Sequence, residues 1–225
     1  MAAKPGERKL QILQTVAHML EQPKGEKITT AALAAKLELS EAALYRHFAS
    51  KAQMFEGLIE FIEQTVFGLI NKITQEEKSG VKQIEATISM LLSFAEKNRG
   101  MTRVLIGDAL VNEDERLQLR INQLLDRIEA TLKQSLRMAA TQGEMGEAVD
   151  GMAQDMLVNG TGMPSPTPSR TAAARTVSGV DVGAHANLLV CYVIGRWTQF
   201  AKSGFTREPM AQWPAQWAIL LQRKT

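Results

Sequence analysis

Apolar side chains recur every three or four positions along most of the chain, the spacing that gathers them on one face of an α-helix. The pattern is clearest over residues 115–138, where Leu117, Ile121 and Leu124 begin a continuous apolar face. It predicts helices over these ranges: 10–20, 29–37, 40–48, 51–73, 81–97, 101–111, 115–138, 184–202 and 213–222. Alternation of apolar and polar residues, which marks β-strands, is scarce. The sequence therefore predicts an all-α protein.

One long segment lacks this periodicity. From about residue 139 to 182 the chain is rich in Gly, Met, Ser, Thr, Pro and Ala, with alternating prolines at Pro164, Pro166 and Pro168. Such a composition favours a flexible insertion without a fixed fold, acting as a linker, with a partner site as the alternative. The expected organisation is a head over residues 1–50 and a helical body over residues 51–225 that carries this insertion.

The two shortest predicted helices lie within residues 28–48 and are too short to be stable separately. Thr29 and Ser40 stand where these helices would begin, and their hydroxyl groups can accept hydrogen bonds from free backbone N–H groups. Ala34 and Ala35 leave room for a close helix crossing. A shared apolar core is available from Leu33, Leu37, Leu39, Leu44 and Phe48. This layout is typical of a helix-turn-helix, whose second helix enters the major groove of DNA.

The next helix has its own start signal. Ser50 and Gln53 fit a capping box, in which the serine hydroxyl and the glutamine side chain satisfy backbone donors reciprocally. The long fourth helix is therefore expected to begin directly after Ser50.

The segment from Thr30 to Lys51 resembles the DNA-binding head of the TetR family of bacterial regulators. The matching residues are Thr30, Leu33, Ala34, Leu39, Ser40, Ala43, Leu44, Tyr45, Arg46, His47, Phe48, Ser50 and Lys51. The resemblance implies a surface on which the start of the second helix of the motif meets base edges. The residues expected on this DNA-binding surface are Thr29, Thr30, Ser40, Glu41, Ala42, Ala43, Tyr45, Arg46, His47 and Lys51.

The resemblance further implies that Tyr45, His47 and Lys51 hold phosphates. A phenol, an imidazole and an ammonium group can all donate hydrogen bonds to phosphate oxygens. The chain departs from the family at the turn, where Glu38 stands in place of the usual glycine. A left-handed backbone costs a residue other than glycine about 1 kcal/mol. We expect the turn to tolerate this cost, with Glu38 pointing away from DNA.

The charge of the chain is too mild to coat nucleic acid. The formal net charge is +2, and residues 1–51 carry eight Lys and Arg against five Asp and Glu. Non-specific attraction to phosphate should therefore be weak, and base contacts must supply much of the affinity. We expect a homodimer, formed by the helices after residue 115 and above all by 184–202. It would bind palindromic DNA with half-sites about one helical turn apart, and higher-order assembly on DNA stays open.

A narrower resemblance covers about residues 7–137 and indicates, within the TetR family, the nucleoid occlusion factors. The stretches that carry it are 40–48, 58–63, 120–124 and 127–130. It implies that the DNA-bound dimer engages the tubulin-like division protein FtsZ and blocks septum assembly over the chromosome. No small-molecule ligand would be required.

The same resemblance implies where the partner binds. The tail of FtsZ would lie in a groove between the fourth and fifth helices, where Phe61, Lys97 and Asn98 match the pattern. The alternative is that Phe61 belongs to the core and Lys97 is an ordinary solvated helix end. Leu69 departs from the pattern, which carries a basic residue at this position.

The sequence offers less support for other functions. The nearer alternative is a ligand-responsive TetR-type transcriptional repressor, which needs a mostly apolar pocket enclosed by the body helices. An enzyme is not expected, since His18, His47 and His185 are scattered, and no cofactor or metal site is indicated. Without a signal peptide or membrane span, the protein is expected in the cytoplasm at the nucleoid. Cys191 stands among apolar residues and is expected to be buried.

Overall fold

The computed structural model describes residues 5–22, 28–145, 148–149 and 180–221. Its elements, in chain order, are α1 (Pro5–Leu20), α2 (Thr30–Lys36), α3 (Glu41–Tyr45), α4 (Lys51–Glu76), α5 (Gly80–Lys97), α6 (Arg99–Leu105), the 3-10 helix η1 (Asp108–Leu110), α7 (Glu115–Thr141), β1 (Ala148–Val149), β2 (Val180–Asp181), α9 (Val182–Lys202) and α10 (Trp213–Leu220). The strands β1 and β2 form a parallel pair of two residues each. The predicted all-α class is confirmed, because helices make up nearly all the regular structure of the described residues.

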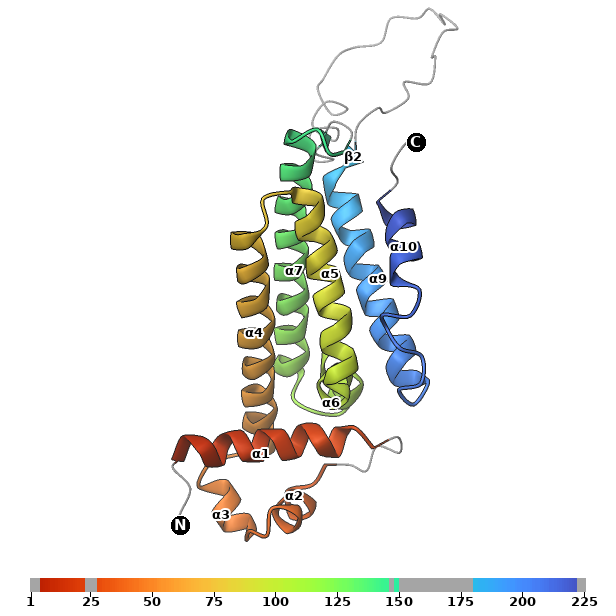
Figure 1. The fold of residues 1–225 in the computed structure, drawn as a ribbon. Coiled ribbons are helices and arrows are strands. Elements are labelled where there is room, and N and C mark those ends of the chain that lie inside the picture. The colour runs from red at the N-terminus through yellow and green to blue at the C-terminus, as the bar shows by residue number, and fades with distance from the viewer. Residues whose placement is uncertain (1–4, 23–27, 146–147, 150–179, 222–225) are drawn as a thin grey trace, which may run out of the picture.

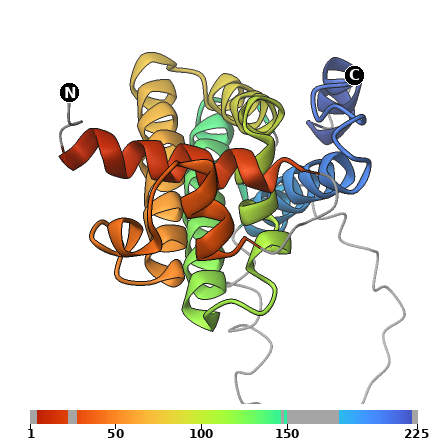
Figure 2. The ribbon, with the colours of Figure 1, turned by 90° about the horizontal axis from the view of Figure 1, so that it is seen from below.

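The helices form an upright body above a small head. Helices α4, α5, α7 and α9 run side by side along the long axis, with α10 outside α9 (Figure 1). Helix α1 lies across the lower end of this bundle, and α2 and α3 lie beneath it (Figure 2). None of the described helices is both long and apolar enough to cross a lipid bilayer.

The centre of the body is filled by aliphatic side chains of α7 and its neighbours. Helix α7 packs against α4, α5 and α9, so its periodic apolar face becomes the middle of the core. Ile84, Ile121 and Leu124 are fully buried there. Trp197 of α9 is buried as well, and its indole N–H donates to the carbonyl of Leu91 at 3.1 Å. This hydrogen bond satisfies the one polar group that the large ring brings into the core.

A buried glutamine joins three helices near the end of the bundle that lies away from the head. The side-chain nitrogen of Gln83 donates to the carbonyl oxygens of Thr74 and Glu77 at 3.2 and 2.8 Å. Its side-chain oxygen accepts from the hydroxyl of Ser135 at 2.9 Å. Because buried polar groups are costly without partners, these bonds fix the end of α4, the start of α5 and α7 relative to one another.

Most predicted helices are present, with their ends shifted by a few residues. The helix predicted over 101–111 is divided instead: α6 ends at Leu105 and η1 follows Gly107. Gly107 has a φ of 78°, a left-handed conformation that ends an α-helix and that glycine adopts without steric cost.

The start of the segment expected to be flexible is structured. Helix α7 continues to Thr141, and the side chains of Gln142 and Glu144 accept from the backbone N–H groups of Gly80 and Val81 at 2.9 and 3.0 Å. They therefore satisfy N–H groups at the start of α5 that have no partner within the helix. Of the rest of the expected insertion, residues 146–147 and 150–179 lie outside the described residues.

Helix α9 has an exposed stripe that the sequence did not reveal. Ala184, Leu188, Cys191 and Gly195 follow one another at helical spacing and are all exposed, Leu188 by 54%. We call these four residues the outer stripe of α9. The expectation that Cys191 is buried is wrong, because the apolar run around it covers the whole circumference of the helix and only one side faces the core.

The head meets the body through a close approach of two backbones. Gly100 of α6 is buried against α1, and a Cβ atom at this position would lie 1.8 Å from the carbonyl oxygen of Ala17. Real Cβ atoms never approach an oxygen so closely, so only glycine permits this contact.

We predict that Gly100→Ala lowers the free energy of unfolding by about 1–3 kcal/mol, because the overlap can be relieved only by moving backbone. Urea denaturation measures the change. The matched control is Gly68→Ala in α4, where a Cβ meets nothing within 4 Å. It should be neutral or stabilising by up to about 1 kcal/mol, since alanine is the better helix former. Equal losses at both positions would contradict the close contact of α1 and α6.

Candidate nucleic-acid interface

The two short helices begin where their capping residues predicted. The hydroxyl of Thr29 accepts from the backbone N–H of Ala32 at 3.1 Å, and the hydroxyl of Ser40 accepts from Ala43 at 3.1 Å. Both caps are confirmed. Each cap satisfies a backbone N–H group in the first turn that has no partner within the helix.

The turn between α2 and α3 contains a left-handed residue. Glu38 has a φ of 53° and is exposed, and the N–H of Leu39 closes the turn on the carbonyl of Ala34 at 2.9 Å. The expected backbone is confirmed, without the glycine that would adopt it most easily. On the inner side, Leu33 and Leu44 are fully buried and hold the two helices together.

Helix α4 begins with a modified capping box. The hydroxyl of Ser50 accepts from the N–H of Gln53 at 3.1 Å, as predicted. The side chain of Gln53 accepts from Ala49 at 2.8 Å and not from Ser50 itself. The reciprocal cap therefore reaches one residue further back and also fixes the end of the turn after α3.

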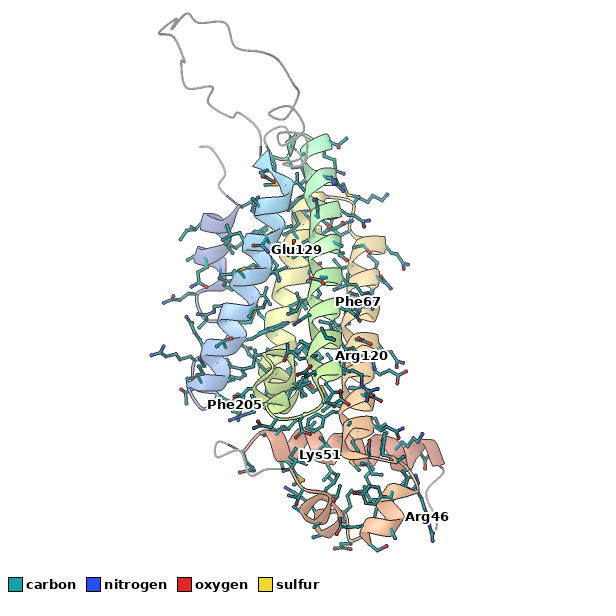
Figure 3. All side chains as sticks on the ribbon, turned by 180° about the vertical axis from the view of Figure 1, so that it is seen from behind. Arg46, Lys51, Phe67, Arg120, Glu129 and Phe205 are labelled. Atoms are coloured by element: carbon teal, nitrogen blue, oxygen red, sulfur yellow. The ribbon has the colours of Figure 1, made fainter. Side chains whose placement is uncertain are left out.

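The structure leaves most of the expected DNA-binding residues accessible. The exposed ones are Thr29, Ser40, Glu41, Ala42, Tyr45 and Arg46, and the half-buried ones are Thr30, Ala43, His47 and Lys51. Tyr45 is 45% exposed. Figure 3 shows Arg46 at the outer end of the head, away from the body. The edge formed by Tyr45, Arg46 and His47 therefore faces outwards, as contact with a duplex requires.

A hydrogen bond connects the two helices on this outer side. The hydroxyl of Thr30 donates to the carboxylate of Glu41 at 2.7 Å. Glu41 is the first residue of α3, and an acid on the expected DNA-binding surface would be repelled by phosphate. Its carboxylate can instead accept from the amino group of a cytosine in the major groove. Thr30 thus restrains the side chain that stands at the start of the expected reading helix.

Lys51 is paired with a carboxylate of the body. Its ammonium group forms an ion pair with Glu113, in the turn between η1 and α7, and lies 5.7 Å from the centre of the Phe55 ring. Glu113 is a residue that sequence reasoning missed. It stands 62 positions away from Lys51 in the chain, and no local pattern connects the two.

The residues expected in the partner groove lie on adjoining helices. Phe61 on α4 is half-buried and packs against the core, and Lys97 is exposed in the last turn of α5. The side-chain amide of Asn98 donates to the carbonyl of Phe94 at 2.8 Å. Leu69, further along α4, is 40% exposed. Phe61 therefore takes part in the core and keeps one edge at the surface.

A head with a helix-turn-helix below a bundle of longer helices is the architecture of TetR-type DNA-binding regulators. The sequence profile described as "Bacterial regulatory proteins, tetR family" matches residues 18–58. The profile described as "Tetracyclin repressor-like, C-terminal domain", of the SlmA-like type, matches residues 78–160.

Whole-chain relatives narrow this class. The chain is 44% identical over 221 residues to the nucleoid occlusion factor SlmA of Alteromonas mediterranea, covering 98% of this chain and 97% of the relative. It is 42% identical to the SlmA proteins of a Marinomonas species and of Idiomarina loihiensis, covering 99% of this chain in both comparisons and 97% and 98% of those relatives. The chain belongs to the SlmA family of nucleoid occlusion factors.

Solved structures agree on the fold. FadR from Bacillus subtilis, in complex with stearoyl-CoA, superposes with a TM-score of 0.68 over 96% of this chain and 99% of that one, at 13% identity. PfmR of the TetR family from Thermus thermophilus has a TM-score of 0.66 over 96% of each chain, at 18% identity. At sequence identities this low, the superpositions establish a shared fold and say nothing about function.

We predict that Tyr45→Ala weakens binding to duplex DNA about tenfold whatever the sequence, because a phosphate contact carries no sequence information. Fluorescence anisotropy with a palindromic and a scrambled duplex measures both affinities. Tyr45→Phe separates the hydroxyl from the ring. The control is Tyr192→Phe, since the only other tyrosine of the chain lies in the body and bonds to Gln216. Unchanged affinity of Tyr45→Ala would refute the phosphate contact.

Proposed function

We propose that this protein is a nucleoid occlusion factor, a dimer that binds palindromic chromosomal sites and inhibits assembly of the FtsZ ring over the nucleoid. Identity of 44% across nearly the whole chain to a protein of that name is the observation that carries the proposal. The outward-facing edge of α3 supports its DNA-binding part. The protein would act in the cytoplasm, at the nucleoid.

Specific base contacts would dominate the binding of DNA. The head has only three more basic than acidic residues over 1–51, eight against five, and Lys51 is already paired with Glu113. Ser40, Glu41, Ala42 and Ala43 stand at the start of α3, where side chains of a recognition helix reach base edges. Arg46 follows at its end and can reach either a base or a phosphate.

The outer stripe of α9 is the surface that we assign to dimerisation. Ala184 and Gly195 are small enough for two helices to approach closely, and Leu188 offers an apolar side chain that is 54% exposed. A second copy would cover this stripe by a two-fold contact of the same surface. Two heads would then face successive turns of the duplex.

We predict that Leu188→Arg converts the dimer into a monomer, because two like charges would meet at the two-fold contact. Sedimentation velocity measures the mass, and affinity for a palindromic duplex should fall at least about tenfold as the second head is lost. Leu69→Arg is the control, since Leu69 is 40% exposed on α4, outside the helices expected to form the dimer. A Leu188→Arg protein that stays dimeric would exclude the outer stripe.

The tail of FtsZ would bind between α4 and α5. Helix α5 runs back towards the head, so its last turn with Lys97 lies beside the head-proximal half of α4, which carries Phe61. An ammonium group beside a partly exposed aromatic ring suits a peptide with acidic and apolar residues. This part of the proposal rests on the resemblance and on these three residues, Phe61, Lys97 and Asn98.

We predict that Lys97→Glu abolishes inhibition of FtsZ assembly at concentrations where the unchanged protein inhibits it, because the new charge repels an acidic peptide. Light scattering of purified FtsZ with protein and duplex measures assembly. DNA affinity of the variant should be unchanged. Lys202→Glu, at the exposed end of α9, makes the same charge change elsewhere and should still inhibit. If both variants inhibit assembly, the binding site for FtsZ does not include Lys97 of α5.

The alternative remains a ligand-responsive repressor. The centre of the described body argues against a large apolar ligand, since Ile84, Ile121 and Leu124 are fully buried among other side chains. A hollow of about 370 Å³ between α4 and α7 is lined by Glu56, Glu63, Arg116, Leu117, Leu119, Arg120 and Gln123. The charged side chains of this hollow suit neither an acyl chain nor an aromatic drug. A second hollow, of about 510 Å³ between the start of α5 and α10, places Val81, Trp217 and Leu221 beside Lys82, Glu85 and Glu144, and the ligand of a repressor would have to bind there. DNA release by a metabolite, with FtsZ assembly untouched, would favour the repressor.

A further inference from the structure

Lys51 has its carboxylate partner in the body, at the junction of the two parts of the molecule. Figure 3 shows Lys51 at the top of the head, with Arg46 at the opposite, outer end. The side chain of Lys51 is 27% exposed and that of Glu113 is 18% exposed. The pair is therefore partly shielded from water, so it is stronger than an ion pair at an open surface.

The position of Glu113 is fixed by the turn that carries it. Asn112 adopts a left-handed backbone with a φ of 65°, and the N–H of Glu113 donates to the carbonyl of Leu110 at 3.0 Å. Asp114 caps α7 by accepting from the N–H of Arg116 at 3.0 Å. Hydrogen bonds from Arg116 lower the pKa of Asp114 to about 2, so this cap persists at any physiological pH. These hydrogen bonds hold the backbone of Glu113 on both sides, so its carboxylate can follow Lys51 only as far as the side chain reaches.

Glu113 and a DNA phosphate would thus compete for the ammonium group of Lys51. A phosphate close to the start of α4 would attract Lys51, which is the role that the family pattern gives it. The same movement would leave Glu113 without its cation in a site with little access to water. An unpaired and partly buried carboxylate is costly, and this cost would be subtracted from the free energy of DNA binding.

We infer that Glu113 competes with DNA phosphate for Lys51 and so sets the DNA affinity of the head from within the body. The inference rests on the proposed DNA-binding function and adds to it a residue outside the helix-turn-helix. Glu113 lowers affinity in the free protein, and capture of Lys51 by phosphate leaves the Glu113 carboxylate without its cation.

The test compares two charge-neutralising changes that stand two residues apart. Glu113→Gln should bind a duplex of arbitrary sequence about three- to tenfold more tightly, because Lys51 no longer leaves a carboxylate behind. Glu115→Gln removes the same charge from an exposed position that makes no ion pair with Lys51, and should change affinity by less than about twofold. Thermal unfolding of each variant verifies the fold.

A double-mutant cycle shows whether Lys51 carries the effect. In a Lys51→Ala background, Glu113→Gln should give no gain in affinity.

Several results would overturn the inference. Weaker or unchanged binding by Glu113→Gln would show that the carboxylate positions Lys51 for phosphate or does not matter. A gain that persists without Lys51, or that equals the effect of Glu115→Gln, would reduce the effect to general electrostatics. If the unchanged protein bound no duplex at all, the proposed DNA-binding function itself would be refuted. If it binds DNA, the results above refute only the competition between Glu113 and phosphate for Lys51.

Discussion

The two short helices of the head are held together by apolar contacts that each helix can make only with the other. Helices of seven and five residues are unstable in water, so α2 and α3 exist only because their inner faces are buried. Leu33 and Leu44 are fully buried, and the same apolar cluster continues through Ile12 of α1 into Leu58 of α4. The direction of the exposed edge, with Tyr45 and Arg46, is therefore set by the core behind it.

The same dependence extends from the head into the body. Gly100 lets α6 touch the backbone of α1, and Lys51 at the start of α4 is paired with Glu113 ahead of α7. One contact is steric and the other electrostatic, and they lie on different helices. The head is consequently attached to the body at two separate points. A change in either contact would alter the orientation of the exposed edge with Tyr45 and Arg46.

Local signals in the sequence predicted local structure well. Thr29, Ser40 and Ser50 were recognisable as caps because a cap and its target N–H are only three residues apart. The helical periodicity likewise predicted the body helices, since the apolar residues of each helix lie on the face that is buried.

Long-range contacts left no such trace. Gln142 and Glu144 cap a helix that begins more than sixty positions earlier, which an irregular composition after residue 139 did not suggest. The exposed outer stripe of α9 was hidden because residues of one hydrophobic class surround the helix, and only the packing partner decides which side is buried. Glu113 was invisible for the same physical reason, as its partner is brought near by the fold.

Helix α4 places the expected DNA contact and the expected partner contact on one rigid element. Lys51 and Phe61 are ten positions apart in a single helix, which separates them by about 15 Å at 1.5 Å per residue. A helix of 26 residues buried along one face does not bend easily between these points. A partner bound at Phe61 would therefore be held at a fixed distance from the duplex.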